Sequence, residues 1–325
     1  MDVPDPKLEA GEVLIRVKAC ALNHLDIWER QGLPGVKLPM PHISGSDIAG
    51  VVEAKGGDVS GIQTGENVII SPGISCAACH YCREEKDSLC SAFHIMGLQV
   101  NGGYAEFVKA PARAVIQISE KLSLEEWAAI PLVFLTVWHM LITQADLQPG
   151  ESILIHAAGS GIGSAAVQVA KWKGAKVFVT ASNDEKLDRA RTLGADVGIN
   201  YKQTDFSEEI KKMTGGHGVN VVFEHIGLET FTGSLSSLAK GGRLVTCGAT
   251  SGPEVNLDLR FLFMKQLSIT GSYMGSRGEL LQVLKLVEEG KLQPVIDKLF
   301  PMKEAKQAQE RMLNREQFGK IVLVP

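Results

Sequence analysis

The sequence has no transmembrane segment, no secretory signal and no excess of basic residues. No run of about 18 apolar residues occurs, so no transmembrane helix is expected. The opening MDVPDPKLEAGE has neither the basic nor the apolar region of a secretory signal, so we expect a cytoplasmic protein. Charge is nearly balanced, 33 basic against 37 acidic residues, which removes any electrostatic drive toward nucleic acid or membrane. There is also no internal repeat and no low-complexity tract.

What remains is the composition of an ordinary globular protein, with 45% apolar and 22% charged residues. A chain of 325 residues is too long for one small core, so we expect two domains. The natural partner of such a chain is a small molecule.

The two halves of the sequence have different periodicities. Up to about Ile118, short runs such as EVLIRVKA and DIAGVVEA are bounded by turn residues, which predicts a mostly antiparallel β domain. At Ser123 a serine followed by acids indicates a helix N-cap, and a helical pattern continues to about Gln144. From Gln148 on, apolar strands such as SILIHA and KVFVTA alternate with helical stretches, which is typical of a parallel sheet built from βαβ units.

The strand SILIHA runs into a glycine-rich loop, HAAGSGIG, and a helix follows. Glycines in this context let the backbone turn tightly and approach a pyrophosphate, whose charge lies at the helix N-terminus. The spacing is tighter than the usual dinucleotide fingerprint, so a plain strand-to-helix turn of small residues is the alternative. The strand–loop–helix context favours a dinucleotide site at Gly159, Ser160, Gly161 and Ile162.

The end of the second strand of this unit bears on the choice of cofactor. An NAD enzyme usually has an acid here, about 20 residues after the glycines, whereas this sequence has Ala181. Asp184 and Glu185 come a turn later, at a predicted helix start where acids are expected in any case. Ser182 and Lys186 are suited to a 2′-phosphate. NADPH is therefore the expected cofactor, with NADH as the alternative.

Four cysteines share one turn-rich loop: Cys76, Cys79, Cys82 and Cys90. In a reducing compartment this spacing favours metal over disulfides. Four thiolates fill the coordination sphere of tetrahedral zinc and leave no position for water or substrate, so the predicted zinc is structural. A zinc-ribbon reader of nucleic acid is the alternative, which the mixed charges of 83–87 disfavour. His80 and His94 are expected to be bystanders.

In this order, the cysteine loop, HAAGSGIG, the stretch GSDIAGVVEA and the ending FGKIVLV resemble the medium-chain dehydrogenase/reductase superfamily over essentially the whole chain. The resemblance implies a doubly wound Rossmann domain at 121–265. It also implies a GroES-like β-rich catalytic domain at 1–120 and 266–325, with a zinc lobe at 73–93. Homodimers or homotetramers are implied as well. Family members usually begin with a further strand or hairpin, so this chain is expected to be short by that element.

Further cofactor contacts are expected in the Rossmann domain and near the C-terminus. Residues that follow predicted strands lie at the carboxyl edge of the sheet, where α/β proteins bind ligands: Ile226, Gly248, Ala249 and Ser272. The resemblance implies a nicotinamide contact at Thr136, an adenosine-phosphate contact at Tyr201 and a phosphate contact at Lys320. A surface position is the alternative for Lys320.

Some members of the superfamily carry a second, catalytic zinc, and its ligand positions can be compared with this sequence. They correspond to Asn23, to Ser46 and to the residues around Leu132, none of which binds zinc well. Cys20 lies three residues before the first of these positions and is out of register. The chain therefore resembles the quinone oxidoreductases, which have no catalytic zinc.

The stretch LNHLDIWERQG supplies most of the candidate catalytic residues. Asn23 is expected to contact the substrate or the nicotinamide ribose, or else to order its own turn. Asp26 is expected to orient a neighbour or cap a helix. Trp28 either walls the pocket or belongs to the core. Tyr273, after the last strand, is a candidate proton donor or an ordinary packed tyrosine.

Three functional hypotheses follow. The first is a zinc-free NADPH-dependent reductase of quinones, enones or similar activated carbonyls. The second is a zinc alcohol dehydrogenase with an atypical site made from His24, Asp26 and Asp47. That site is disfavoured because residues two apart on a helix do not face each other. The third is a dinucleotide-binding protein without enzymatic activity.

Overall fold

The computed structural model describes residues 3–32, 38 and 40–325, and the chain divides into two compact units. Unit 1 comprises Met1–Leu135 and Gly275–Pro325, and unit 2 comprises Thr136–Met274. The sequence analysis had placed the two divisions earlier, at 120/121 and 265/266. The first falls later because α3 (Leu124–Ala128) packs on the β-sheet of unit 1. The second falls later because β13 (Ser268–Gly271) completes the sheet of unit 2.

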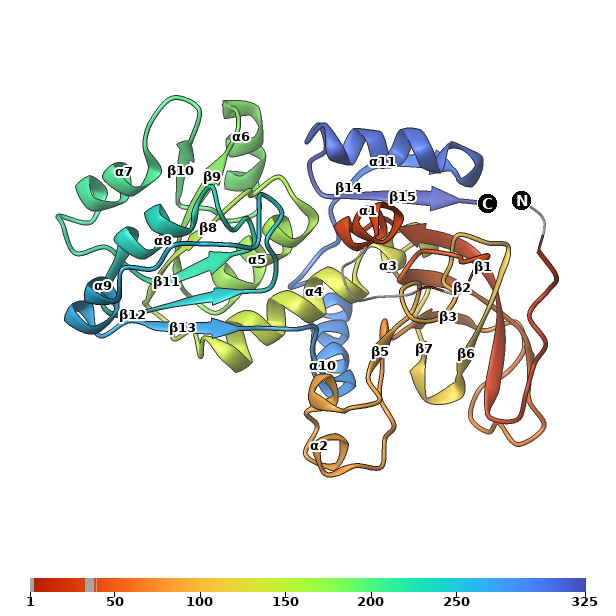
Figure 1. Ribbon diagram of the computed structural model, residues 1–325. Helices are drawn as coiled ribbons and strands as arrows, with labels where there is room; N and C mark the ends of the chain where they lie inside the picture. Colours follow the sequence, from red (N-terminus) through yellow and green to blue (C-terminus); the bar gives the residue numbers. More distant parts are fainter. Residues whose placement is uncertain (1–2, 33–37, 39) are drawn as a thin grey trace. The chain divides into compact units, whose positions relative to one another are not determined.

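Unit 1 is built on a seven-stranded sheet in the order β14-β15-β1-β2-β3-β7, with β6 also paired to β1 (Figure 1). All pairs are antiparallel except β14 with β15. The strands are β1 (Glu12–Ala21), β2 (Asp47–Lys55), β3 (Asn67–Ile70), β6 (Phe107–Pro111), β7 (Val115–Gln117), β14 (Ile296–Pro301) and β15 (Lys320–Val324). A small hairpin, β4 (Gly73–Ile74) with β5 (His94–Ile95), flanks the cysteine loop.

Alternating side chains of β1 explain why this sheet forms. Val13, Ile15 and Val17 are buried on one face, while the residues between them are more exposed, which is the two-residue period of a half-buried strand. These residues join a core with buried aliphatic side chains of β2, β3 and β6. Where β1 and β2 come closest, a Cβ on Gly50 would lie 2.3 Å from the carbonyl oxygen of Arg16. Only glycine allows that approach.

The helices that lie wholly within unit 1 range from 4 residues in the shortest to 12 in the longest. They are α1 (His24–Gln31), α2 (His80–Arg83), α3, α10 (Arg277–Glu288) and α11 (Ala305–Leu313). The predicted cap at Ser123 is present, since its side chain accepts a hydrogen bond from the backbone of Glu126. The predicted continuous helix to Gln144 is wrong, because the chain breaks after α3. It restarts as α4 (Pro131–Trp138), with the proline at the first helical position, where its missing N–H costs nothing. A π-helical turn, His139–Gln144, follows.

Unit 2 contains a six-stranded, wholly parallel sheet in the order β10-β9-β8-β11-β12-β13. The strands are β8 (Ser152–Ile155), β9 (Lys176–Ala181), β10 (Val197–Asn200), β11 (Val219–Glu224), β12 (Leu238–Thr246) and β13. Read in chain order this is 3-2-1-4-5-6, the doubly wound Rossmann arrangement. The predicted fold class is thereby confirmed.

The connecting helices of unit 2 are α5 (Gly161–Trp172), α6 (Asp184–Thr192), α7 (Phe206–Met213), α8 (Phe231–Ser237) and α9 (Leu259–Lys265). Right-handed crossovers place α5 and α6 on one face of the sheet and α8 and α9 on the other. The strand order reverses at β8 and β11, which makes the ends of these two strands the expected ligand site.

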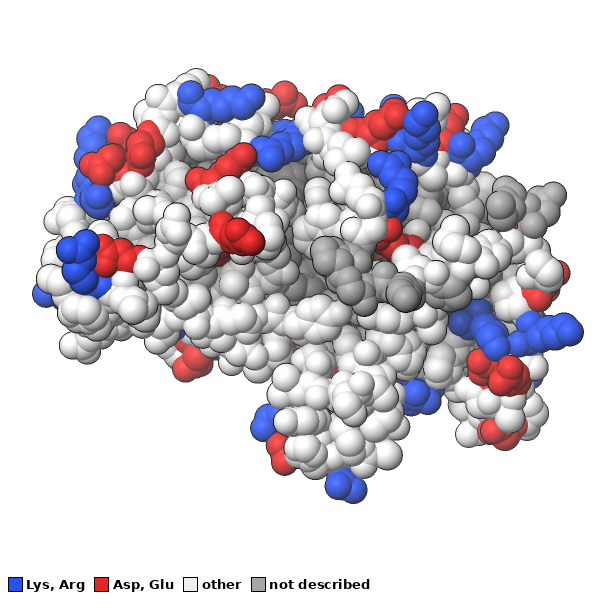
Figure 2. Space-filling view, in the orientation of Figure 1, with Lys and Arg blue, Asp and Glu red and all other residues white. Residues whose placement is uncertain are grey.

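On the face shown in Figure 2, basic and acidic side chains lie close to one another, mostly toward its edges, without a field of one sign. Among the described residues no helix is long and apolar enough to cross a membrane.

Candidate functional site

The four predicted metal ligands of unit 1 come together at one point. Their sulfur atoms all lie within 4.8 Å of one another. Cys79 caps α2, Cys82 lies inside it, and Cys90 follows a short 3-10 turn. Backbone N–H groups of Ala78 and Cys79 donate to Cys76 Sγ, which lowers the pKa of that thiol to about 6 and prepares it as a thiolate.

The spacing of the sulfurs fits zinc. A tetrahedral site with Zn–S bonds of about 2.3 Å has sulfur–sulfur edges of about 3.8 Å. Cys76 Sγ lies 3.8 Å from Cys82 Sγ, which in turn lies 3.5 Å from Cys79 Sγ. No disulfide links any of the cysteines. His80 stacks on its neighbour Tyr81, outside the set of four. Zinc bound here would be closed to substrate and would hold the lobe in shape.

The cysteine lobe is fastened to the rest of unit 1 through an aspartate. Asp87 Oδ2 accepts a hydrogen bond of 2.9 Å from the backbone N–H of Arg277, the first residue of α10. The other oxygen of Asp87 lies 3.4 Å from Ser75 Oγ. The lobe therefore also completes the N-terminus of a helix that is far away in sequence.

In unit 2 the glycine-rich loop leaves β8 and enters α5 at the point where the strand order reverses. Ser160 caps the helix and accepts a hydrogen bond of 2.9 Å from Gly163 N. A Cβ at Gly163 would lie 2.3 Å from the carbonyl oxygen of Ala157, so the helix packs on the loop only because this residue is glycine. Gly161 and Ile162 form the first turn of α5, where free N–H groups and the helix dipole favour a pyrophosphate.

Beneath this loop runs a directed chain of buried hydrogen bonds. His156 Nδ1 lies 3.2 Å from Thr180 Oγ1, and its Nε2 lies 2.9 Å from Ser234 Oγ. Ser234 donates to Glu224 Oε2 at 2.6 Å, so the imidazole carries its proton on Nε2 and accepts at Nδ1. Burial lowers the pKa of His156 to about 4, which keeps the ring neutral. The chain fixes the ends of β8, β9 and β11 relative to one another.

Glu224 also shapes the turn that carries the predicted contact Ile226. Its Oε1 accepts hydrogen bonds from the backbone N–H groups of Ile226 and Gly227, at 2.7 and 3.1 Å. The turn after β12, which contains Gly248 and Ala249, reaches the same place, since Ser251 N donates to Ile226 O at 2.7 Å. The structure therefore brings these predicted cofactor residues together at the carboxyl edge.

Two of the predicted cofactor residues have a buried hydroxyl group without a partner in the described part of the chain. Thr136 Oγ1 and Ser272 Oγ are buried and have no hydrogen-bond partner among the described residues. Burying a hydroxyl without a partner is costly, so such groups usually serve a ligand or water. The nicotinamide half of a dinucleotide, rich in polar groups, is chemically suited to both. Tyr273, next in sequence, is 53% exposed.

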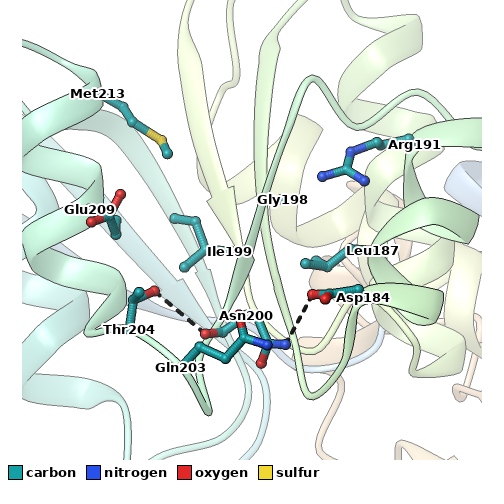
Figure 3. A pocket seen from close by; sticks show the side chains of 10 residues that line it. All are labelled: Asp184, Leu187, Arg191, Gly198, Ile199, Asn200, Gln203, Thr204, Glu209 and Met213. Atoms are coloured by element: carbon teal, nitrogen blue, oxygen red, sulfur yellow. Dashed lines mark hydrogen bonds between the residues drawn. The ribbon is translucent and has the colours of Figure 1, made fainter.

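The adenosine end of the expected site lies near β9 and β10. Ser182 and Lys186 flank the cap of α6, and the backbone of Tyr201 donates to Ala181 O at 3.2 Å. Beside them a cavity of about 210 Å³ lies along β10, where Asp184 accepts a hydrogen bond from Asn200 at 3.0 Å (Figure 3). Asp184 is therefore engaged within the protein, as expected for an acid in the first turn of a helix.

In unit 1 the segment that contains Asn23 is tied to a buried lysine. Lys320 Nζ donates to Leu22 O at 2.7 Å, to Asn23 Oδ1 at 2.7 Å and to Asp47 Oδ2 at 2.8 Å. An ammonium has three donors, so all of them are used inside unit 1. Lys320 is 3% exposed, and this arrangement leaves no donor for the cofactor phosphate that the sequence analysis assigned to it.

Asp47 completes the cluster. Its Oδ2 also accepts from Asn23 Nδ2 at 2.9 Å, and its Oδ1 accepts from the backbone N–H of Leu132 at 2.7 Å. The amide of Asn23 is thus held at both ends. One carboxylate and one ammonium thus join the three segments that the sequence analysis compared with the ligand positions of a catalytic zinc.

Asp26 lies next to this cluster and is fully buried. Its Oδ2 accepts hydrogen bonds of 2.8 Å from Asn23 N and from the hydroxyl of Tyr104. Burial raises the pKa of Asp26 to about 7, against the opposing effects of these hydrogen bonds and of Lys320. Asp26 therefore both anchors the start of α1 and titrates near neutrality. Trp28, on the same helix, is half-buried and packs edge-on against the ring of His24.

Among the described residues, the four cysteines are the only cluster of three or more Cys, His, Asp or Glu side chains placed to bind one metal. The atypical site imagined from His24, Asp26 and Asp47 is not such a cluster, and Asp47 already neutralises Lys320.

Comparison with known proteins identifies the same two kinds of domain. Family models match at residues 9–120, for the alcohol dehydrogenase GroES-like domain, and at residues 161–289, for the zinc-binding dehydrogenase. An alcohol dehydrogenase of Geobacillus stearothermophilus is 34% identical over 99% of this chain and 94% of its own. A quinone oxidoreductase of Pongo abelii is 31% identical over 99% of this chain and 91% of its own. A crystal structure of an NAD-dependent alcohol dehydrogenase has a TM-score of 0.96 and 43% identity, covering 100% of this chain and 95% of that one.

The parallel sheet with its glycine loop, the β-rich unit and the four-thiolate site define an oxidoreductase that uses a nicotinamide dinucleotide and contains a zinc-binding lobe. The chain belongs to the zinc-binding medium-chain dehydrogenase/reductase superfamily, as its motifs indicated. The names of its relatives include both alcohol dehydrogenases and a quinone oxidoreductase.

Sequence reasoning missed several residues of these sites. Tyr104 and Glu224 were not singled out, and Lys320 was assigned to the cofactor. Tyr104 has no local signal, because its partner Asp26 is 78 residues away. Glu224 ends a strand next to a turn at the carboxyl edge of the sheet, and that position was a usable signal.

The cysteine lobe gives the first prediction. Purified protein is expected to hold about one zinc per chain, and Cys90→Ser is expected to lose it. Because Asp87 couples the lobe to α10, the same variant should lower the Tm by roughly 5–10 °C. Metal analysis and thermal unfolding measure both effects. Cys247→Ser, outside the lobe, is the control and should keep its zinc; full zinc retention in Cys90→Ser would contradict the assignment.

The raised pKa of Asp26 gives the second prediction. The folded protein holds the proton of Asp26 more tightly than the unfolded chain does. This proton therefore contributes to the free energy of unfolding at low pH, and the contribution is lost as pH rises toward 7. The difference in unfolding free energy between wild type and Asp26→Asn should change by about 2 kcal/mol between pH 5 and pH 8. Urea unfolding at the two pH values measures it. A difference independent of pH would show that Asp26 titrates normally.

Proposed function

We propose that the protein is a reductase that passes a hydride from NADPH to a quinone, an enone or a similarly activated carbonyl, without a catalytic zinc. The observation that carries this proposal is the Lys320 ammonium, which is bonded to Asn23 and Asp47 where a zinc dehydrogenase would assemble its metal site. A second cation at the same point would meet a positive charge, an amide and a carboxylate that is already paired.

The chemistry follows from what this cluster offers. Oxidising a plain alcohol needs a group that lowers the pKa of the hydroxyl, a task that a metal performs well. Reduction of an electron-poor acceptor needs orientation of the two reactants and one proton for each hydride. Asp26, whose pKa is about 7, is suited to hold that proton near neutrality. Asn23 and Trp28 are proposed to line the substrate site. The amide of Asn23 is fixed at both its oxygen and its nitrogen.

The preference for NADPH rests on the residues after β9. Ala181 takes the place where an NAD enzyme has its ribose-binding acid, and Asp184 is engaged with Asn200. Ser182 and Lys186 lie at the start of α6, where a 2′-phosphate would also be favoured by the helix dipole. The test below therefore compares NADPH with NADH.

We also propose that the protein is a homo-oligomer joined through unit 2. β13 is an edge strand, and α9 beside it exposes Leu259, Phe263 and Met264 at 62, 67 and 69%. An open edge next to exposed apolar side chains is a liability unless it is covered. A second copy of the chain, related by a two-fold axis, would pair edge with edge and cover both.

The function is tested by following NADPH and NADH oxidation at various concentrations of quinones, enones and aldehydes, with metal analysis of the same preparation. We expect turnover of a quinone or an enone, a lower KM for NADPH than for NADH, and about one zinc per chain. Two zincs per chain with NAD⁺-dependent oxidation of an alcohol would support the dehydrogenase alternative. Binding of the cofactor without turnover of any acceptor would support the non-enzymatic one.

The assembly is tested by Phe263→Glu, which places a charge in the middle of the exposed apolar face of α9. We expect wild type to be a dimer or tetramer and the variant to be smaller, as measured by size-exclusion chromatography with light scattering. Leu313→Glu, at a 40% exposed apolar position in unit 1, is the matched control and should leave the assembly unchanged. A monomeric wild type at micromolar concentration would refute the proposal.

A further inference from the structure

Four buried polar atoms on α1 and on the segment 42–46 have no hydrogen-bond partner among the described residues. They are Asp26 Oδ1, Glu29 Oε2, His42 Nδ1 and Ser46 Oγ. A buried polar group without a partner costs free energy. Such a group in a folded protein usually contacts a ligand or a water, or takes part in catalysis. The four atoms include two carboxylate oxygens and an imidazole nitrogen, which are all groups that exchange protons.

Two of the four belong to a close acid–base pair. His42 Nε2 lies 2.6 Å from Glu29 Oε1, and their side chains are only 4% and 3% exposed. The same nitrogen lies 3.1 Å from Gly97 O. Since both neighbours of Nε2 are acceptors, this nitrogen is the donor of the ring, and Nδ1 is the ring nitrogen without a partner among the described residues. Ser44 Oγ donates to Glu29 Oε1 at 3.0 Å.

The pair is also linked to Asp26. Glu29 follows Asp26 by three residues on α1, so the two carboxyl groups lie on the same side of the helix. The charge of Glu29 is one of the causes that raise the pKa of Asp26, and burial raises the pKa of Glu29 itself. Each carboxyl group has one oxygen engaged by donors and one oxygen without a protein partner.

The charged and titratable groups around Asp26 and Glu29 come from several elements. Lys320 of β15 and Asp47 of β2 neutralise each other. Tyr104 donates to Asp26, and burial raises its pKa well above the usual value, so it stays protonated. Cys20 of β1 is likewise kept as a thiol by burial. Asp26, Glu29 and His42 are therefore the side chains here that combine acid–base groups with an atom lacking a partner among the described residues.

We propose that Asp26, Glu29 and His42 form a buried proton relay, completed by water between their unpartnered atoms, that supplies the proton consumed in each reduction. The inference rests on the proposed function for its reaction. Four unpartnered polar atoms offer the two to four partners that a buried water requires. Ser46 Oγ, at the end of the same segment, provides one of them. Glu29 and His42 act through Asp26 and are positioning residues rather than groups that touch the substrate.

The relay balances the reaction as follows. A bound dihydronicotinamide would supply the hydride, so that the cofactor would be oxidised and the acceptor would gain a hydrogen with its electron pair. The reduced acceptor, now an anion, takes a proton from the carboxyl group of Asp26. Water passes a proton from the Glu29–His42 pair to the resulting carboxylate, and a proton from solvent restores the pair. The net consumption is one proton for each hydride.

The test uses Glu29→Gln, which keeps the size of the side chain but cannot ionise. We expect kcat to fall by about tenfold or more, with a larger solvent isotope effect in D₂O and little change in the KM for NADPH. A second readout needs no turnover. The ¹³C chemical-shift titration of the Asp26 carboxyl group, centred at about 7 in wild type, should move to lower pH because a neighbouring negative charge is gone. Arg30→Gln, on the exposed side of the same helix, is the matched control.

A milder variant covers the case in which Glu29→Gln does not fold. Ser44→Ala removes a hydrogen bond that lowers the pKa of Glu29, so the alkaline limb of the kcat profile should move to higher pH. An unchanged pH profile and solvent isotope effect in a folded variant, or an unmoved Asp26 titration, would overturn the relay. If wild type reduces no acceptor, the proposed function fails, and the Asp26 titration still decides whether the three groups are linked.

Discussion

The buried ammonium of Lys320 is the constraint on which unit 1 depends. It joins β15 to the β1–α1 junction through Leu22 and Asn23, and to β2 through Asp47. Asp47 extends the connection to the start of α4 at Leu132. Breaking a buried ion pair on one side costs about 3–5 kcal/mol, because the remaining charge has no solvent. A lysine near the end of the chain therefore fixes residues almost 300 positions earlier.

This arrangement also explains how the protein itself orders the cluster of Asn23, Asp47 and Lys320. In a metalloenzyme the cation draws its ligands together, whereas here a covalently attached cation serves that purpose and cannot dissociate. Polar atoms without a partner among the described residues lie beside it: one oxygen of Asp26, and atoms of the Glu29–His42 pair one helical turn away. Unit 2 shows a similar contrast. Both oxygens of Glu224 accept hydrogen bonds, whereas the hydroxyl groups of Thr136 and Ser272 have no partner among the described residues.

The sequence was sufficient wherever the signal is local. The four cysteines, the cap at Ser123 and the strand–glycine–helix turn at Gly163 depend on neighbours a few residues apart, and their positions were predicted. The helix break at Pro131 was also local and was overlooked. What could not be read depends on contacts across the chain. The prediction that Lys320 contacts a phosphate was wrong, since its partner is the carboxylate of Asp47. Sheet register decides which way a strand residue faces, and the sequence alone does not show that register.

The aspartate of the cysteine lobe has one further consequence. Asp87 and Arg277 are 190 residues apart, and Arg277 opens α10 just after the chain has returned from unit 2. The lobe is therefore not an appendage that folds for itself alone. Loss of the lobe, for example by oxidation of its thiols, would also displace the carboxylate that accepts from the first residue of α10. Damage at the cysteine loop would therefore also affect the segment with which the chain re-enters unit 1.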